Sequence, residues 1–314
     1  MRTIVSIDIG GTRLRAAAYK QDQFQPISQK RVETKAKEPN AFGRLINLLE
    51  DIWPKNENVD AIGVSSPGPV DPHTGVIMVT PNIKEWRDFP ITAKLTDHFG
   101  IPAYLDNDAN LAGLAEWKFG AGRGHHNVLY LTVSTGVGGG VIINDQLLQG
   151  HHGLAAELGH TTIQADGPLC GCGQPGHLES FSSGTGIERF VAEQLKAGRE
   201  SLLQLDKKNS AHAISEAAKQ GDALSIEAYQ NAGKYLGIGV ANFLHAFDPS
   251  IGIFGGGVSQ VGDLLFGPFQ ASLKKRVFHP RYLEGLSFAT ATLGDNAGLL
   301  GALALARMMS ESNG

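Results

Sequence analysis

Asp8, Gly10, Gly11 and Thr12 are the first residues whose types and spacing could do chemistry, because they join two strand-like segments. Glycines have no Cβ, so their backbone N–H groups can approach an anion closely, and the hydroxyl of Thr12 adds another polar contact. Asp8 ends the first strand and could hold Mg²⁺ through water, since hydrated Mg²⁺ takes few carboxylates. Taken alone, the motif is as compatible with a plain Gly-Gly hairpin and a capping Asp as it is with an anion-binding site.

A second glycine-rich turn, Ser134–Gly140, repeats this arrangement. Residues 129–147 follow the same order as residues 4–24: strand, Gly-rich turn, strand, polar turn. We interpret the pair as an internal duplication, in which Thr135, Gly136 and Gly138 offer a second cradle for phosphate. Two such turns suit a nucleoside triphosphate held between two lobes. Neither turn opens into a helix or carries Gly-Lys-Ser/Thr, which excludes the Rossmann fingerprint and the P-loop.

A third glycine cluster, Gly255, Gly256 and Gly257, follows the predicted strand 251–254. Bare backbone at this point would let a nucleotide base and ribose lie against it, so we expect Gly256 and Gly257 to border the adenosine. A tight turn from a strand into a helix is the alternative explanation.

The elements that must position these turns alternate between strands and helices. Helical spacing of apolar residues predicts helices over 42–53, 109–119, 185–197, 212–220, 223–247 and 297–309, and short apolar runs predict strands at 60–64, 103–106, 251–254 and 286–293. Such alternation is typical of an α/β protein.

Composition limits the class of protein further. Glycine contributes 40 of the 314 residues, far above the usual share of about 7%. The formal net charge of −4 gives no overall field for nucleic acid, and apolar stretches are too short and interrupted to span a membrane. The N-terminal segment has the pattern of a strand, not of a signal peptide. Two cysteines do not make a disulfide framework, so we expect a cytoplasmic protein.

Together these motifs resemble the ROK sugar kinases, within the actin and hexokinase superfamily. The resemblance covers nearly the whole chain, with the motifs in family order: DIGGT (8–12), SSPGPVD (65–71), LDNDAN (105–110), STGVGGG (134–140), ELGH (157–160), CGCGQPGHLE (170–179) and GGG (255–257). It implies two ribonuclease H-like (actin-like ATPase) α/β domains with an interdomain cleft. We expect a small domain over 1–119, onto which helix 297–310 packs back, and a larger domain over 120–296.

The resemblance makes Asp108 the expected catalytic base. A sugar hydroxyl is a weak nucleophile, and an adjacent carboxylate can accept its proton while the phosphoryl group is transferred. The residues alone favour helix capping by Asn107-Asp108. The family pattern further assigns substrate binding to Gly68, Asn107, Asp108, Glu157, His160 and Glu179.

The family also implies a structural zinc ion. Cys170, Cys172 and His177, together with His160, supply four donors that suit a closed tetrahedral site. The sequence departs from the commonest family pattern, which has a third cysteine where this chain has His177. Two reduced cysteines in a metal-free loop are the alternative.

The expected activity is transfer of the γ-phosphoryl group of ATP, with Mg²⁺, to the 6-hydroxyl of a hexose, most often glucose in this family. N-acetylmannosamine, N-acetylglucosamine, mannose, fructose and allose stay open as substrates, as does polyphosphate as donor. The family also includes sugar-responsive repressors, but we expect no DNA-binding arm before Asp8. The resemblance suggests a homodimer or homotetramer, with no nucleic acid or membrane as partner.

Overall fold

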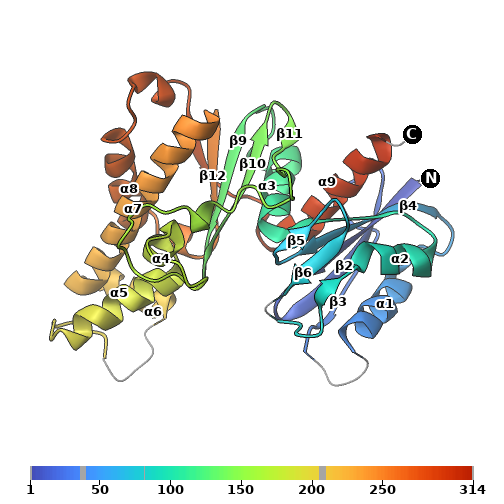
Figure 1. Ribbon diagram of the computed structural model, residues 1–314, viewed down its shortest axis with the longest axis horizontal. Coiled ribbons are helices and arrows are strands. Elements are labelled where there is room, and N and C mark those ends of the chain that lie inside the picture. The colour runs from blue at the N-terminus through green and yellow to red at the C-terminus, as the bar shows by residue number, and fades with distance from the viewer. Residues whose placement is uncertain (1, 36–39, 81, 205–209, 313–314) are drawn as a thin grey trace. The chain divides into compact units, whose positions relative to one another are not determined.

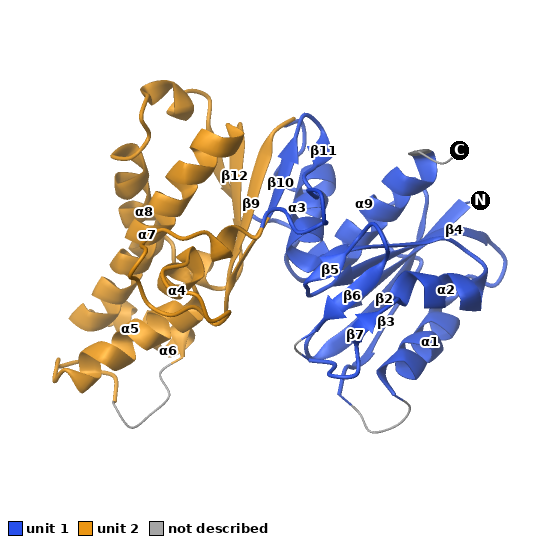
Figure 2. Cartoon of the chain, viewed as in Figure 1, with its two compact units in different colours: residues 1–125, 140–156, 291–314 blue, residues 126–139, 157–290 orange. Residues whose placement is uncertain are grey.

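The computed structural model describes residues 2–35, 40–80, 82–204 and 210–312, and the chain forms two compact units (Figures 1 and 2). Unit 1 combines residues 1–125, 140–156 and 291–314, and unit 2 combines residues 126–139 and 157–290. Each unit is therefore built from separate stretches of chain. The domain ranges expected from the sequence, 1–119 and 120–296, are each continuous, unlike these units. The domain boundaries stay a prediction.

Unit 1 is built on a five-stranded sheet with the order β3-β2-β1-β4-β8. β1 pairs antiparallel with β2 and β2 antiparallel with β3, whereas β4 runs parallel to both β1 and β8. The strands are β1 (Arg2–Ile9), β2 (Arg13–Lys20), β3 (Ser28–Glu33), β4 (Asn58–Ser66) and β8 (Ala103–Asn107). The predicted hairpin around Gly10–Thr12 is thus confirmed as the β1–β2 connection.

Both faces of this sheet are buried, because successive residues of β1 enter different cores. Val5 and Ile7 pack with apolar residues of α1 (Ala41–Ile52) and α2 (Ile91–Phe99), while Ile4 packs with residues of α9 (Ala297–Ser312). α3 (Asp108–Phe119) lies against α9 and contributes Ala115 to the second core. The sheet is therefore a rigid platform between two helical layers.

A small three-stranded sheet, formed by β5 (Val70–Asp71), β6 (Val76–Val79) and β7 (Arg87–Phe89), was not predicted. Its strands are only two to four residues long, so no alternation of apolar residues marks them in the sequence. It stands directly after the turn that contains Gly68.

The second five-stranded sheet has the order β11-β10-β9-β12-β13. Like the first, it combines an antiparallel edge with parallel strands, since β12 runs parallel to β9 and β13. The strands are β9 (Val128–Val133), β10 (Val137–Ile143), β11 (Gln146–Leu147), β12 (Ile251–Gly255) and β13 (Ser287–Thr290). The two glycine-rich turns therefore occupy equivalent connections, β1–β2 and β9–β10, as the internal duplication predicts.

The helices of unit 2 gather around α7 (Ala223–Phe247), which contacts α4, α5, α6 and α8. Gly233 and Gly237 let α7 approach α8, because a Cβ at either position would meet the backbone of Leu265 or Phe269. The other helices are α4 (Leu178–Ser182), α5 (Gly184–Lys196), α6 (Ala211–Lys219) and α8 (Asp263–Lys274). No helix in the described part of the chain is long and apolar enough to cross a membrane.

The contact between β4 and α9 yields a prediction about stability. A Cβ at Gly63 would lie 1.9 Å from the carbonyl oxygen of Ala302, which is backbone and cannot rotate away. We expect Gly63→Ala to lower the free energy of unfolding by about 1–3 kcal/mol. Denaturant titration measures this, with Gly267→Ala on α8 as the control because open space surrounds Gly267. Equal stability of the two variants would contradict the assignment of β4 and α9 as a close contact.

Candidate active site

The first glycine turn, in unit 1, is held in shape by Thr34. The Thr34 hydroxyl donates to the carbonyl oxygen of Gly10 at 2.8 Å, and its N–H donates to the carbonyl oxygen of Thr12 at 2.8 Å. Gly10 itself must be small, since a Cβ would lie 2.8 Å from the carbonyl oxygen of Arg13. The carbonyl oxygens of Gly10 and Thr12 are thus bound to the protein, as is the Gly10 N–H, which donates to the carbonyl oxygen of Arg13 at 2.9 Å. The N–H groups of Gly11 and Thr12 are therefore the ones that suit an anion.

Asp8 lies beside this turn and is paired with Arg15, which stands opposite it in the β1–β2 register. The Nε of Arg15 donates to Oδ2 of Asp8 at 2.8 Å, and Asp8 is only 7% exposed. A Cβ at Gly298 would reach 2.3 Å from Oδ1 of Asp8, so glycine there lets the start of α9 approach the carboxylate. The single carboxylate at a strand end fits a hydrated Mg²⁺, and its arginine partner was not predicted.

Asn107 and Asp108 lie where β8 passes directly into α3. The Oδ1 of Asn107 accepts from the N–H groups of Ala109 at 2.8 Å and Asn110 at 3.3 Å, so Asn107 is the helix cap. Asp108 is the first helical residue and its side chain is exposed. Gly68 lies close by, because a Cβ there would be 3.2 Å from Nδ2 of Asn107. Unit 1 thus brings Gly68, Asn107 and Asp108 together.

Asp106 precedes this turn and is completely buried. Its Oδ1 accepts from the Asn107 N–H at 2.7 Å and from Nδ2 of Asn110 at 3.1 Å, and its Oδ2 accepts from Nε2 of Gln149 at 2.6 Å. Burial raises the pKa of Asp106, while these hydrogen bonds oppose the rise. No role was predicted for Asp106.

The second glycine turn, in unit 2, connects β9 with β10 and is held by two other elements. At the start of α5, Gly184 donates from its N–H to the carbonyl oxygen of Ser134 at 2.7 Å, and the Thr185 hydroxyl donates to the carbonyl oxygen of Thr135 at 3.0 Å. From α4, Oε2 of Glu179 accepts from the Val137 N–H at 3.0 Å. A Cβ at Gly136 would lie 2.4 Å from the same oxygen, which explains the glycine there.

A pocket of about 520 Å³ opens beside this turn, within unit 2. Ser134 and Thr135 line one part of it and Gly257 another, so the structure brings the second and third glycine clusters to one cavity. Gly256 has φ +87°, and a Cβ there would lie 2.3 Å from the carbonyl oxygen of Val133, so the turn requires glycine. The other lining residues are Gly184, Thr185, Glu188, Ser210, Ala211, His212, Ser215, Glu216, Lys219, Tyr229, Val258, Gln260 and Val261.

Glu157 and His160 border a short 3₁₀ turn, η1 (Leu158–His160), in unit 2. A Cβ at Gly159 would lie 1.9 Å from the carbonyl oxygen of Val137, so η1 packs directly against β10. Glu157 is exposed, whereas His160 is half-buried and turns its Nδ1 toward Cys170. The two residues predicted to bind one sugar therefore lie at opposite ends of one turn.

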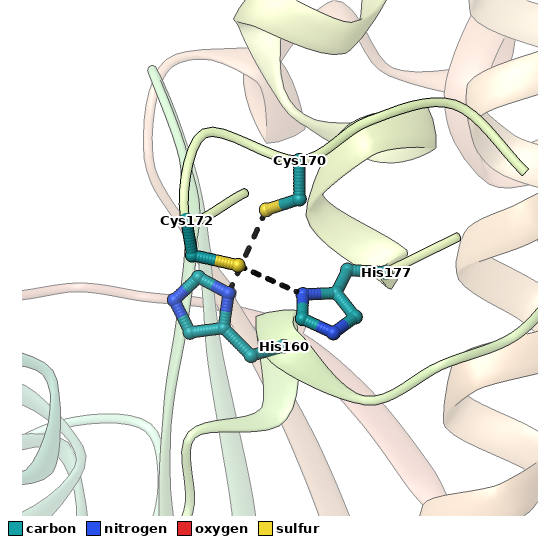
Figure 3. A group of neighbouring side chains, drawn as sticks. All are labelled: His160, Cys170, Cys172 and His177. Carbon is teal, nitrogen blue, oxygen red and sulfur yellow. Dashed lines mark hydrogen bonds between the residues drawn. The ribbon is translucent and has the colours of Figure 1, made fainter. Parts of the chain in front are cut away.

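His160, Cys170, Cys172 and His177 form the cluster that the sequence predicts (Figure 3). Their donor atoms all lie within 4.8 Å of one another, with 3.7 Å between Cys170 Sγ and His160 Nδ1 and 3.3 Å between Cys172 Sγ and His177 Nδ1. Two thiols and two imidazoles at this spacing fit tetrahedral Zn²⁺, and His177 reaches the cluster in place of a third cysteine. Zinc itself stays a prediction.

The chemistry of Cys170 depends on its neighbours. Burial raises the pKa of its thiol to about 12, and the carboxylate of Glu179, whose Oε1 accepts from the thiol at 3.2 Å, adds to the rise. Without a metal ion, Cys170 is therefore a thiol at neutral pH, and a bound cation would have to displace its proton. Glu179 thus contacts both the cluster and the second glycine turn.

Known proteins similar to this chain belong to the family that these motifs indicate. The ROK family model matches residues 4–309, so the chain belongs to the ROK family. The chain is 36% identical to a glucokinase of Streptomyces coelicolor over 98% of both chains.

Solved structures are similar over equally long stretches. The ROK hexokinase of Thermus thermophilus has a TM-score of 0.84 and 34% identity, covering 99% of each chain. A ROK family glucokinase from Streptomyces griseus, in complex with glucose and AMPPNP, has a TM-score of 0.77 and 33% identity, covering 98% of this chain and 99% of that one. The actin-like α/β fold that the resemblance implied is therefore confirmed.

Proposed function

We propose that this protein is an ATP-dependent hexose kinase that phosphorylates the 6-hydroxyl of glucose. The observation that carries the proposal is the β8–α3 turn, where an exposed carboxylate, Asp108, stands beside the amide of Asn107 and the backbone of Gly68. Similarity to glucokinases over nearly the full chain supports glucose as the hexose.

Asp108 is the general base of this mechanism. It accepts the proton of the sugar 6-hydroxyl as the new P–O bond forms, and its exposure leaves the carboxylate accessible to substrate. Asn107 and Gly68 orient the sugar, and Glu157, His160 and Glu179 supply further acceptors and donors, as the family pattern assigns. Such positioning matters because phosphoryl transfer needs alignment and charge neutralisation more than covalent help.

The nucleotide is assigned to the glycine turns and the pocket of unit 2. Thr135, Gly136 and Gly138 bind phosphate, and Gly256 and Gly257 border the adenosine. Of these two glycines, Gly257 lines the same pocket as Ser134 and Thr135. Gly10, Gly11 and Thr12 supply the phosphate contacts of unit 1, where Asp8 would hold Mg²⁺ through water. When bound, Mg²⁺ neutralises phosphate charge.

A hexose panel tests the proposed function. ADP release is measured with ATP and each of glucose, mannose, fructose, allose, N-acetylglucosamine and N-acetylmannosamine, and with polyphosphate replacing ATP. We expect the highest kcat/KM for glucose with ATP. A higher value for another sugar would change the substrate, and sugar binding without any turnover would favour a sugar-responsive regulator. We propose that the enzyme acts in the cytoplasm, where ATP is present, as a homodimer or homotetramer.

Zinc would be held by His160, Cys170, Cys172 and His177 and would order the loop that leads into Glu179. We expect elemental analysis of protein purified without added metal to find about one zinc per chain, as a single closed site requires. Cys172→Ser should lose this zinc, while Ser201→Ala outside the cluster should keep it. A wild-type protein that is metal-free, folded and active would contradict the assignment.

A further inference from the structure

We propose that Gln149 is a positioning residue for phosphoryl transfer, which acts through Asp106 on the turn that carries Asp108. The inference rests on the proposed function, because it takes Asp108 as the base. All three residues belong to unit 1, and Gln149 follows β11 by two positions. Gln149 is not one of the residues proposed to contact sugar or nucleotide.

Asp106 is the part of the pair that shapes the turn. Its side chain binds the N–H of the next residue, Asn107, at 2.7 Å, and reaches one helical turn ahead to Asn110 at 3.1 Å, both through Oδ1. These two bonds fix the direction in which β8 leaves the sheet and α3 begins. Asp108 lies between the two bonded residues, so the place of its carboxylate depends on the rotamer of Asp106.

Gln149 fixes that rotamer. Its Nε2 donates at 2.6 Å to Oδ2 of Asp106, whereas the bonds to Asn107 and Asn110 use Oδ1. A completely buried carboxylate needs donors on both oxygens, because an unsatisfied buried charge is costly. Among the hydrogen bonds of the described residues, Gln149 is the donor to Oδ2.

The segment that presents Gln149 is itself anchored in unit 1. The carbonyl oxygen of Gln149 accepts from the Ala155 N–H at 3.0 Å, which closes the loop between them. Gly153 lies so near Pro72 that a Cβ would be 2.0 Å from the proline ring. The loop is thus held on both sides, and the side chain of Gln149 has a fixed place from which to reach Asp106. Glu157, a predicted sugar ligand, follows this segment two residues after Ala155.

An exchange of donor and acceptor tests the pair. Gln149→Glu sets two carboxylates within hydrogen-bond distance, and we expect it to lower kcat for glucose by about 10- to 100-fold at pH 8, with a smaller change in KM. Asp106→Asn combined with Gln149→Glu restores one donor against one acceptor. We expect this double variant to recover kcat to within a few-fold of the wild type, which a merely destabilised loop would not do.

The pH profile provides a second readout. Two carboxylates this close share one proton at low pH, so the kcat of Gln149→Glu should approach the wild-type value as pH falls from 8 to 5.5. The charges of His73, which lowers the pKa of Asp106, and of Asp108 also act near this pair, but both residues are present in the wild type and in the control. The control is Gln146→Glu, the same change at an exposed residue of β11. It should show the wild-type profile.

Thermal unfolding of each variant separates activity from folding. If Gln149→Glu unfolds at the assay temperature, Gln149→Met removes the donor without adding charge and should lower kcat in a pH-independent way. A kcat within two-fold of wild type for the folded Gln149 variants, or a double variant no better than Gln149→Glu, overturns the inference. Wild-type protein that binds glucose and ATP without turnover would overturn the proposed function instead.

Discussion

Replacing Asp108 with asparagine is expected to lower kcat by about 10²- to 10⁴-fold, the range that general-base catalysis contributes. The amide cannot accept the proton of the sugar hydroxyl, yet it keeps the size of the side chain and an oxygen for the Ala109 N–H, which Oδ1 of Asp108 accepts at 2.8 Å. Glucose binding, measured by calorimetry, should change much less than kcat.

The matched control for this prediction is Asp263→Asn. Asp263 is also an exposed aspartate at the first position of a helix, α8, so it reports any effect of the same change on helix charge. We expect its kcat to equal that of the wild type. If Asp108→Asn also retained wild-type turnover, Asp108 would not be the base and the proposed mechanism would be wrong.

Local patterns predicted the parts of the site that depend on short stretches of chain. The β1–β2 turn, the Asn107 cap and the start of α3 all follow from residue types within a few positions, and all are present. The cluster of His160, Cys170, Cys172 and His177 could also be predicted from the sequence, since three of its four residues lie within eight positions of one another.

Contacts between distant residues could not be predicted in the same way. The bond from Gln149 to Asp106 spans 43 positions, and the bond from Val137 to Glu179 spans 42. The sequence does not indicate which distant residue a polar side chain will contact. A Gln or Glu that forms such a bond cannot be told, by its residue type, from one that is exposed to solvent. The pair of Asp8 and Arg15 is different, since the two lie at symmetric positions around the predicted hairpin turn and could have been found from its register.

Glu116 is the most consequential of these distant contacts. It lies on α3 with 0% exposure and accepts four hydrogen bonds, from the N–H groups of Ala121, Thr292 and Leu293 and from the Thr292 hydroxyl, at 2.7 to 3.1 Å. These bonds tie the end of α3 to the segment that leads into α9, across 176 positions of sequence for Thr292. The residue pattern predicts this part of α3 only as a helix and gives no sign of these bonds.

Glu116→Gln is therefore expected to destabilise unit 1 strongly. The amide keeps one acceptor and turns an NH₂ group toward N–H donors, so buried donors are left without partners. We expect the free energy of unfolding to fall by about 3–5 kcal/mol, the cost of breaking a buried charged network. Denaturant titration checks this against Glu193→Gln, which removes an exposed ion pair with Arg189 and should cost at most about 0.5 kcal/mol. A similar loss of unfolding free energy for the two variants would show that the Glu116 hydrogen bonds contribute no more than a surface ion pair. The apolar contacts between α3 and α9 would then be what stabilises this part of unit 1.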